Sequence, residues 1–344
     1  MSLSKSKVLI VNRKPRAVGN FSLEGIMETL APLLTAHQPV DFWTAPEESN
    51  GILPRIRSVL ALRKYLKYSS YEVVHVFGDV HFLVWGITNA KIVLTIHDIG
   101  FMNESRGLMR SLLKFFWMTG PLKKADKVVA VSEATKGNIL QYFPKQMVEV
   151  IPTVISTTFK PREKLFNKNN PKVLLLGTAE NKNVERALNA ILGLSVHVLL
   201  VGKLSKEQHQ RIKQFSYTHW DSCSFEEIKS LYHQSDLVML CSTHEGFGMP
   251  ILEAQATGRP VITSNCSSMP EVAGKGALFV DPYNELSIRQ AVINLVNNAD
   301  LRAELIQYGY ENTKRFDPKI VASKYTTLYT NLLLHESTKT THFN

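Results

Sequence analysis

The sequence of 344 residues predicts an α/β protein built from two doubly wound domains. Apolar runs of strand length alternate with helical segments along the chain, which is the pattern of parallel sheets flanked by helices. A polar segment at residues 152–171 shows no apolar period and separates two sets of such runs. The chain is also long enough for each set to bury its own hydrophobic core.

The expected strands are short, nearly continuous apolar runs, as parallel strands buried on both faces require. In the first half they cover residues 8–11, 40–43, 73–77, 92–96, 128–131 and 148–151. In the second half they cover residues 173–176, 196–201, 237–240, 261–263 and 278–280. We therefore expect an N-terminal domain at residues 1–158 and a C-terminal domain at residues 171–317.

The segment Glu245-Gly-Phe-Gly-Met-Pro-Ile-Leu-Glu253 combines two carboxylates, a glycine-flanked loop and a helix start. It follows an expected strand, and Pro250 suits the first turn of a helix. Backbone N–H groups at a helix start bind anions, and glycines let the backbone approach a ligand closely. The segment therefore predicts a phosphate-binding loop.

The two carboxylates could instead belong to a glycoside hydrolase, whose retaining form holds them roughly 5 Å apart. Continuous helix between Glu245 and Glu253 would rise about 12 Å, so this spacing does not favour a hydrolase. We expect the two groups to bind different parts of one extended ligand. The alternative is an ordinary loop charge followed by a solvated helix residue.

A second glycine loop, Gly177-Thr-Ala-Glu-Asn-Lys-Asn183, follows the first expected strand of the C-terminal domain and precedes a helix. A lysine and a phosphate charge about 4 Å apart attract by roughly 4 kcal/mol at an effective dielectric constant near 20. Lys182 could therefore stabilise the charge on a departing diphosphate. The alternative is a surface lysine at a helix start.

His97 and Asp98 end an expected strand of the N-terminal domain, at the sheet edge where such folds bind ligands. A histidine in this position can also be a buried structural residue. The other histidines show no metal-binding spacing, and the sequence contains no Asp-x-Asp motif, so no metal site is expected.

The segment Arg13-Lys-Pro-Arg-Ala-Val-Gly19-Asn20 follows the first expected strand. No Gly-x-Gly-x-x-Gly motif occurs in the sequence, which counts against a nicotinamide-dependent dehydrogenase. Gly19 either contacts a ligand or serves as a turn glycine, and both interpretations remain open.

The composition is that of an ordinary globular protein, with 44% hydrophobic and 20% charged residues. The sequence has no apolar run of membrane-spanning length and no signal-peptide core, so a cytoplasmic protein is expected. The three cysteines, Cys223, Cys241 and Cys266, show no Cys-x-x-Cys spacing. Neither a disulfide framework nor a thiolate zinc site is therefore expected.

The net charge of +10 comes mainly from the first half of the chain. One expected helix carries Arg55, Arg57, Arg63, Lys64 and Lys67, and a second basic group, Arg106, Arg110, Lys114, Lys123, Lys124 and Lys127, surrounds Leu112, Phe115, Phe116 and Trp117. Basic residues mixed with aromatic ones favour peripheral contact with the inner face of a membrane. A solvated basic face over an aromatic core stripe explains them equally well. No nucleic-acid motif accompanies the charge, so no nucleic-acid partner is expected.

The motif that begins at Glu245 continues with Ala256-Thr-Gly-Arg-Pro-Val-Ile-Thr-Ser264 and Met269-Pro-Glu-Val272. Together these segments resemble the signature of retaining glycosyltransferases of family 4. The resemblance is strong over residues 172–281 and weak in the N-terminal half. It implies the GT-B fold, in which two Rossmann-like domains face a central cleft, with a last helix at 318–335 packing back on the N-terminal domain.

The resemblance also implies roles for the residues of the main motif. Glu245 would contact hydroxyl groups of the donor sugar, and Glu253 would hold the ribose. The loop between them would contact the sugar and the diphosphate through Gly246, Phe247, Gly248 and Met249.

Further roles follow from the same resemblance. His97 would hydrogen-bond the donor sugar beside Asp98, and Lys182 would neutralise the leaving diphosphate. Thr178 and Asn181 stand where the family commonly has basic residues, which leaves this loop less positive. Gly19 is the one glycine present where the family has a glycine-rich loop.

The implied activity is metal-independent transfer of a sugar from a nucleoside-diphosphate sugar to an acceptor hydroxyl, with retained configuration. The acceptor would be a glycan or a lipid-linked glycan of polysaccharide or glycolipid biosynthesis, and the donor is a substrate, so no cofactor is expected. One alternative is a catalytically inactive partner subunit that binds nucleotide sugars. A glycan phosphorylase or sugar-nucleotide epimerase is disfavoured because neither signature is recognised.

Overall fold

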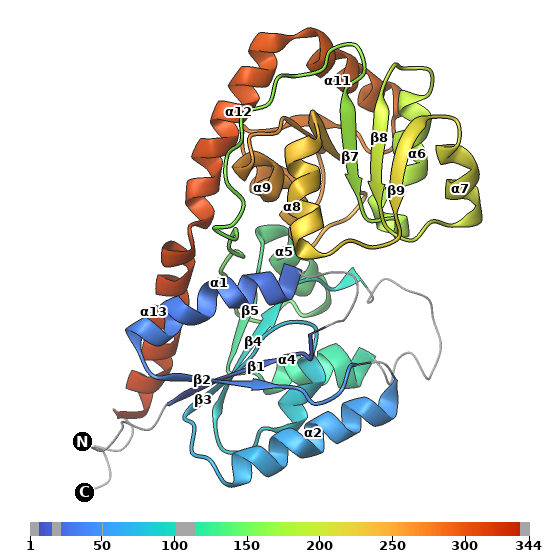
Figure 1. The fold of residues 1–344 in the computed structure, drawn as a ribbon. Coiled ribbons are helices and arrows are strands. Elements are labelled where there is room, and N and C mark those ends of the chain that lie inside the picture. The colour runs from blue at the N-terminus through green and yellow to red at the C-terminus, as the bar shows by residue number, and fades with distance from the viewer. Residues whose placement is uncertain (1–6, 16–21, 50, 101–113, 338–344) are drawn as a thin grey trace, which may run out of the picture. The chain divides into compact units, whose positions relative to one another are not determined.

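The computed structural model describes residues 7–15, 22–49, 51–100 and 114–337. The chain forms two compact units. Unit 1 is built from the described residues of Met1–Arg16, Leu23–Val154 and Pro318–Asn344, and unit 2 is built on Ile155–Asp317. Each unit contains a six-stranded sheet flanked by helices, which confirms the predicted α/β class (Figure 1).

The sheet of unit 1 has the strand order β2-β1-β3-β4-β5-β6, and all its neighbouring strands are parallel. Its strands are β1 (Val8–Asn12), β2 (Val40–Thr44), β3 (Val73–Val76), β4 (Lys91–Ile96), β5 (Lys127–Ala130) and β6 (Val148–Val150). They coincide closely with the apolar runs of the sequence, because a strand buried on both faces needs apolar side chains at successive positions.

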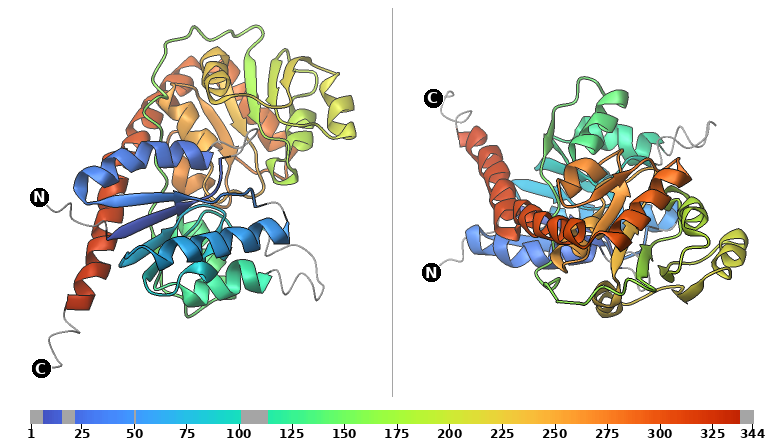
Figure 2. Two further views of the ribbon diagram at one scale, coloured as in Figure 1. Left: turned by 60° about the horizontal axis from the view of Figure 1, so that its bottom comes forward. Right: turned by 90° about the horizontal axis from the view of Figure 1, so that it is seen from above.

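The helices of unit 1 cover both faces of this sheet. They are α1 (Ser22–His37), α2 (Ile52–Lys67), the 3-10 helix η1 (His81–Gly86), the π-helix η3 (Phe115–Thr119), α4 (Gly120–Lys124), α5 (Glu133–Tyr142) and α13 (Pro318–Ser337). Leu62 of α2 and Met118 of η3 share a core with one face of the sheet. Helices α1 and α13 lie on the other side (Figures 1 and 2).

A buried polar network attaches α13 to the sheet of unit 1. The Nδ1 atom of His75 in β3 lies 2.6 Å from the hydroxyl of Tyr329, and its Nε2 atom lies 2.7 Å from the hydroxyl of Thr95. Burial lowers the pKa of His75 to about 3, so the ring is neutral at ordinary pH. A neutral imidazole donates at one nitrogen and accepts at the other, which satisfies both contacts.

The sheet of unit 2 has the strand order β12-β11-β10-β7-β8-β9, and its neighbouring strands are also parallel. Its strands are β7 (Lys172–Leu176), β8 (His197–Val201), β9 (Ser216–Trp220), β10 (Leu237–Leu240), β11 (Val261–Ser264) and β12 (Leu278–Val280). The sequence did not predict β9. This strand lies at the sheet edge with a polar sequence, and His197 contacts its Ser216 and Thr218, so it lacks the apolar run that marks central strands.

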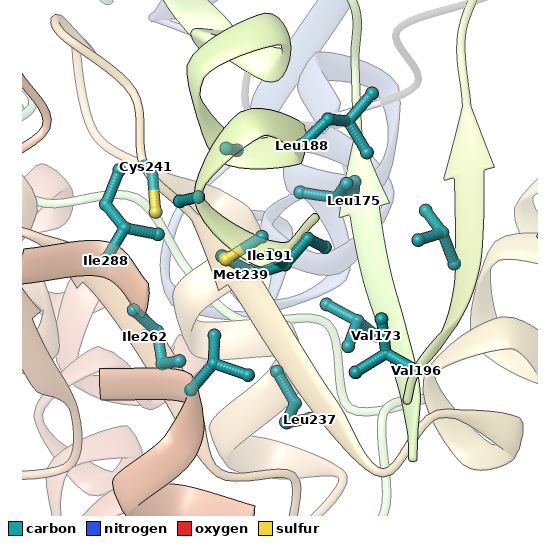
Figure 3. Close-up of a cluster of buried hydrophobic side chains, with 14 of the residues drawn as sticks. Val173, Leu175, Leu188, Ile191, Val196, Leu237, Met239, Cys241, Ile262 and Ile288 are labelled. Atoms are coloured by element: carbon teal, nitrogen blue, oxygen red, sulfur yellow. The ribbon is translucent and has the colours of Figure 1, made fainter. Parts of the chain in front are cut away.

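The helices of unit 2 pack around this sheet. They are η4 (Glu180–Lys182), α6 (Val184–Ile191), α7 (Lys206–Ile212), α8 (Phe225–Gln234), α9 (Met249–Ala256), α10 (Met269–Ala273), α11 (Glu285–Asn297), α12 (Ala299–Thr313) and η5 (Lys314–Phe316). Leu188 of α6 and Ile288 of α11 join Leu175 and Met239 of the sheet in one core (Figure 3). Serine caps with a Glu or Gln three residues later start α7 and α8.

Part of the segment expected to be a linker is packed against unit 2. Phe159 is buried, and its ring contacts Phe225 and Tyr232 edge to face at 5.5 and 5.6 Å. Asp236, directly before β10, accepts hydrogen bonds from the backbone N–H groups of Asn167 and Lys172. These individual contacts hold the expected linker segment against unit 2, although its sequence has no apolar period.

Each sheet reverses its strand order at one point. In unit 1 the reversal lies between β1 and β3, and in unit 2 it lies between β7 and β10. Loops that leave the carboxyl ends of such a strand pair run in opposite directions and leave room for a ligand. The topology therefore predicts that ligand-binding residues lie in the segments after β1 and β3 in unit 1 and after β7 and β10 in unit 2.

We predict that Tyr329→Phe destabilises the protein by about 1–3 kcal/mol, because it leaves a buried nitrogen of His75 without its partner. Urea unfolding followed by tryptophan fluorescence measures the change. Tyr68→Phe is the matched control, since Tyr68 is 74% exposed. Equal stabilities of the two variants would show that the buried network does not hold α13.

Candidate functional site

The pairing of β7 with β10 brings the two glycine loops of unit 2 together. Lys182 follows β7 and Glu245 follows β10, and the lysine Nζ lies 2.7 Å from the glutamate Oε1. Ser242 donates a hydrogen bond of 2.6 Å to the same carboxylate oxygen. Both members of the ion pair remain partly exposed, so a ligand can reach the charged groups.

Gly177 makes room for the Lys182 side chain. The glycine has a φ of +86°, and a Cβ atom built on it would lie 3.1 Å from Cε and 3.2 Å from Cγ of Lys182. Any other residue would both strain the backbone and push against the lysine stem. The loop sequence thus determines where the ammonium group lies.

The loop after β10 is held by two serines from the loop after β11. Ser267 donates to the backbone oxygen of Glu245 at 2.8 Å, and Ser268 donates to the backbone oxygens of Glu245 and Phe247 at 3.0 and 2.8 Å. The Phe247 side chain is buried and packs edge to face on Phe316 at 5.6 Å. Phe247 can therefore meet a ligand only through its backbone.

Helices α6 and α9 begin beside the Lys182–Glu245 pair. Asn183, with a φ of +56°, precedes α6 and donates hydrogen bonds to the backbone oxygens of Cys241 and Pro282. Gly248, with a φ of +98°, precedes α9, and Pro250 follows in its first turn. The positive ends of two helix dipoles thus lie at the carboxyl edge of the sheet, which favours an anion there.

Glu253, the second carboxylate of the motif, is buried inside unit 2. The Tyr232 hydroxyl of α8 donates a hydrogen bond of 2.5 Å to its Oε2 atom. Burial raises the pKa of Glu253 to about 7, although the Tyr232 hydrogen bond and the positive charge of Lys182 oppose that rise. The surroundings of Glu253 therefore bring the titration of its carboxyl group into the physiological pH range.

Thr178 and Asn181, which replace basic residues of the family pattern, have structural contacts. The Thr178 hydroxyl donates a hydrogen bond of 2.7 Å to the backbone oxygen of Lys203. The Asn181 side chain donates one of 2.8 Å to the backbone oxygen of His244 and so ties the two glycine loops together. The role of Thr178 in donor binding stays a prediction.

In unit 1, the carboxyl edge of the sheet gathers polar residues as well. Arg13 follows β1 and donates two hydrogen bonds of 3.0 and 2.8 Å to Glu24 and one of 3.1 Å to Asp79. Arg13 is itself buried. The segment that the family resemblance assigns to a glycine-rich loop thus begins with an ion-paired arginine, and Gly19 lies outside the described residues.

His97 follows β4, and its ring meets Phe77 edge to face at 5.0 Å. Its Nε2 atom is buried without a hydrogen-bond partner within the described part of the chain. Burial lowers the pKa of His97 to about 3, and repulsion from His81 adds to this. Asp98 is exposed and accepts a hydrogen bond from the backbone N–H of Gly100.

Several residues of the site were missed by the sequence analysis. They are Ser242, Ser267, Ser268, Asn183 and Tyr232, all of which position the predicted residues rather than form a motif. The polar run Ser264-Asn-Cys-Ser-Ser268 after an expected strand was a signal that could have identified the two serines. Tyr232 carried no signal, because its partner Glu253 is reached only through the packing of α8 on α9.

No cluster of three or more His, Cys, Asp or Glu side chains able to hold a metal ion occurs within residues 7–15, 22–49, 51–100 and 114–337. Over the same ranges, every helix is too short or too polar to cross a membrane.

Two doubly wound units with polar residues at their strand-order reversals define a class of α/β proteins that bind ligands at the carboxyl ends of their strands. Residues 156–312 match the family described as "Glycosyl transferases group 1", and residues 30–159 match "Glycosyltransferase Family 4". The chain therefore carries a group 1 glycosyltransferase domain preceded by a family 4 glycosyltransferase domain, which confirms the predicted family.

Curated relatives agree with this family. An uncharacterised glycosyltransferase of Methanocaldococcus jannaschii is 24% identical over 233 residues, which cover 65% of this chain and 64% of the relative. The O-antigen chain mannosyltransferase RfbU of Salmonella typhimurium is 25% identical over 272 residues, 74% of this chain and 75% of the relative. The serotype-specific mannosyltransferase WbdA of Escherichia coli is 24% identical over 257 residues, which span 66% of this chain and 32% of that protein.

Solved structures confirm the GT-B fold. Sucrose-phosphate synthase from Thermosynechococcus elongatus superposes with a TM-score of 0.77 at 18% identity, covering 95% of this chain and 99% of that one. Anabaena HepE in complex with UDP and glucose superposes with a TM-score of 0.73 at 17% identity, covering 94% and 99%. At these identities the likeness concerns the fold alone.

The buried carboxyl group of Glu253 leads to a prediction about stability and pH. Its pKa of about 7 in the folded protein is above the ordinary value of 4.5, so the folded state holds this proton more tightly than the unfolded state. The stability contributed by this group is therefore lost as pH rises from about 4.5 to about 7, by up to about 3 kcal/mol. Glu253→Gln removes this dependence.

Urea unfolding of the wild type and of Glu253→Gln between pH 4.5 and 8 tests this prediction. Glu226→Gln, a change at an exposed glutamate of the same unit, is the control. A stability difference between wild type and Glu253→Gln that stays constant over this pH range contradicts the assigned pKa.

Proposed function

We propose that the protein transfers a sugar from a nucleoside-diphosphate sugar to an acceptor hydroxyl with retention of the anomeric configuration. The observation that carries the proposal is the 2.7 Å contact between Lys182 and Glu245 at the strand-order reversal of unit 2. It joins a cation suited to a diphosphate with a carboxylate suited to sugar hydroxyls, beside two helix starts.

In this proposal, different residues of unit 2 bind different parts of the donor. The starts of α6 and α9, together with Lys182, bind the diphosphate. Glu245 accepts hydrogen bonds from sugar hydroxyls, and Glu253, held by Tyr232, binds the ribose. The backbone of residues 246–249 lines the path between the two carboxylates.

In the proposed reaction the bond from the anomeric carbon to the diphosphate oxygen breaks, and a bond to the acceptor oxygen forms on the same face. The acceptor hydroxyl gives its proton to the leaving diphosphate, so no side chain has to act as nucleophile. Lys182 and the helix dipoles stabilise the negative charge of the leaving group, and this supports transfer without a metal ion. Glu245 orients the sugar for this step.

The contribution of unit 1 rests on the family resemblance. His97 would donate or accept one hydrogen bond to the donor sugar, and its neutral ring and unpartnered Nε2 atom support this role. Asp98 would assist it. Relatives named as O-antigen and serotype-specific mannosyltransferases support a glycan or lipid-linked glycan as the acceptor, and with it a cytoplasmic protein at the inner membrane face.

An inactive partner subunit is the second candidate. Thr178 and Asn181 favour it, because both side chains are used in hydrogen bonds to backbone oxygens and add no positive charge to the diphosphate loop.

A thermal-shift screen against nucleoside diphosphates and their sugars identifies the donor, since a ligand at about 100 times its Kd adds roughly 2.7 kcal/mol to the free energy of unfolding. Single-turnover assays with that donor then separate an enzyme from a binding subunit.

We predict that Lys182→Ala and Glu245→Gln each lower kcat at least about 100-fold, which is the effect of losing one charge-stabilising or orienting group. Release of nucleoside diphosphate from the identified donor measures the rate. Lys229→Ala is the control, because it breaks a Lys–Glu ion pair of the same 2.7 Å length on α8. Wild-type turnover in either site variant would refute the assignment.

We also predict that Gly177→Ala weakens donor binding and that Gly193→Ala does not. Both glycines have left-handed backbones, with φ values of +86° and +79°, so both variants should lose about 1 kcal/mol or more of stability. Only a Cβ atom at position 177 would touch Lys182, whereas position 193 has no atom within 4 Å. Calorimetric titration with the donor distinguishes the two, and equal affinities would contradict the role of Gly177.

A further inference from the structure

Helix α2 of unit 1 exposes a set of large aliphatic side chains that the unit 1 core does not use. Ile52, Leu53, Ile56 and Leu60 are between 48% and 66% exposed, whereas Leu62 on the same helix is fully buried. Single exposed apolar residues are common on protein surfaces, but a contiguous set marks an interaction site.

These side chains share one face of α2 with basic residues. Ile52, Ile56 and Leu60 are spaced four residues apart and so lie in a row along the helix. Arg57, Arg63, Lys64 and Lys67 are exposed on the same side. The helix contains no Asp or Glu, and Arg57 has a contact with Glu47 at 3.5 Å, from the segment before the helix.

Exposed aromatic residues of η3 lie at the flank of α2. Phe115 and Phe116 are 43% and 54% exposed. The neighbouring Trp117 ring lies under the guanidinium of Arg55, 3.9 Å from its centroid, which links η3 to α2. Lys123 and Lys124 follow in α4, while Arg106, Arg110 and Leu112 lie outside the described residues.

We propose that the outer face of α2, formed by Ile52, Leu53, Ile56, Leu60 and the basic residues between them, docks unit 1 on an anionic lipid surface, with Phe115 and Phe116 beside it. We call this surface the α2 face. Aliphatic and aromatic side chains enter the boundary between headgroups and acyl chains, while lysine and arginine extend their stems to reach anionic headgroups. Each basic residue near such a surface adds to the attraction.

Charge complementarity favours lipid over a second copy of this chain. A symmetric dimer through the α2 face would place the same cations opposite one another, and like charges across an interface repel. An anionic lipid surface supplies the negative charge that α2 itself lacks. The proposal concerns unit 1 alone and does not rest on the transfer chemistry proposed for unit 2.

The experiment is cosedimentation of the full chain with vesicles of phosphatidylcholine, with and without 30% phosphatidylglycerol. We expect binding to the anionic vesicles only, weakened several-fold by a rise in salt from 50 to 500 mM. The variant Ile56→Ser/Leu60→Ser should weaken binding at least about tenfold, and Arg63→Gln/Lys67→Gln by a similar factor. The control is Ile320→Ser/Leu334→Ser, which removes two exposed aliphatic side chains from α13 of the same unit.

Three results would overturn the proposal. They are absence of binding by the wild type, equal binding to both kinds of vesicle, and a concentration-dependent dimer that is lost in Ile56→Ser/Leu60→Ser. Circular dichroism confirms that each variant is folded. Thermal shift with the nucleotide-sugar donor should be the same in the wild type and the α2 variants, so failure of membrane binding and failure of donor binding are seen separately.

Discussion

The parallel pairing of β7 with β10 is the constraint on which the candidate site depends. The two strands are distant in sequence, yet Val173 lies opposite Leu237 in the sheet. Because both strands run in the same direction, the loops that follow them emerge at one edge. The apolar core, which includes Val173, Leu237 and Met239, holds the two strands together (Figure 3). It therefore also positions the loops that carry Lys182 and Glu245.

The site contains a carboxyl group whose ionised form is disfavoured by burial. Glu253 is buried against Tyr232, and its raised pKa shows that the surroundings oppose its ionised form. The ribose of the proposed donor would give this carboxyl group a polar partner outside the protein. The Tyr232 hydrogen bond offsets part of the cost of burial and also directs the carboxylate.

Unit 1 contains two separate groups of basic residues. At the carboxyl edge of its sheet Arg13 is satisfied by Glu24 and Asp79, so this buried cation is neutralised within the unit. In α2, by contrast, Arg57, Arg63, Lys64 and Lys67 are exposed, and the helix itself contains no Asp or Glu. The first group thus has a structural role within unit 1, and the second is the one on which the proposed lipid docking depends.

The sequence by itself determined the fold class, most strand positions and the two glycine loops with Lys182, Glu245 and Glu253, because apolar period, glycine and helix-start signals are local. It could not supply β9, whose place at the sheet edge lets polar residues form a strand. Nor could it show that Lys182 meets Glu245 or that Tyr232 meets Glu253, since these contacts join positions 63 and 21 residues apart. The sequence also allows two interpretations of the basic helix, a membrane-binding face or a solvated face. Only packing decides which face of α2 meets the core and which aliphatic side chains remain in solvent.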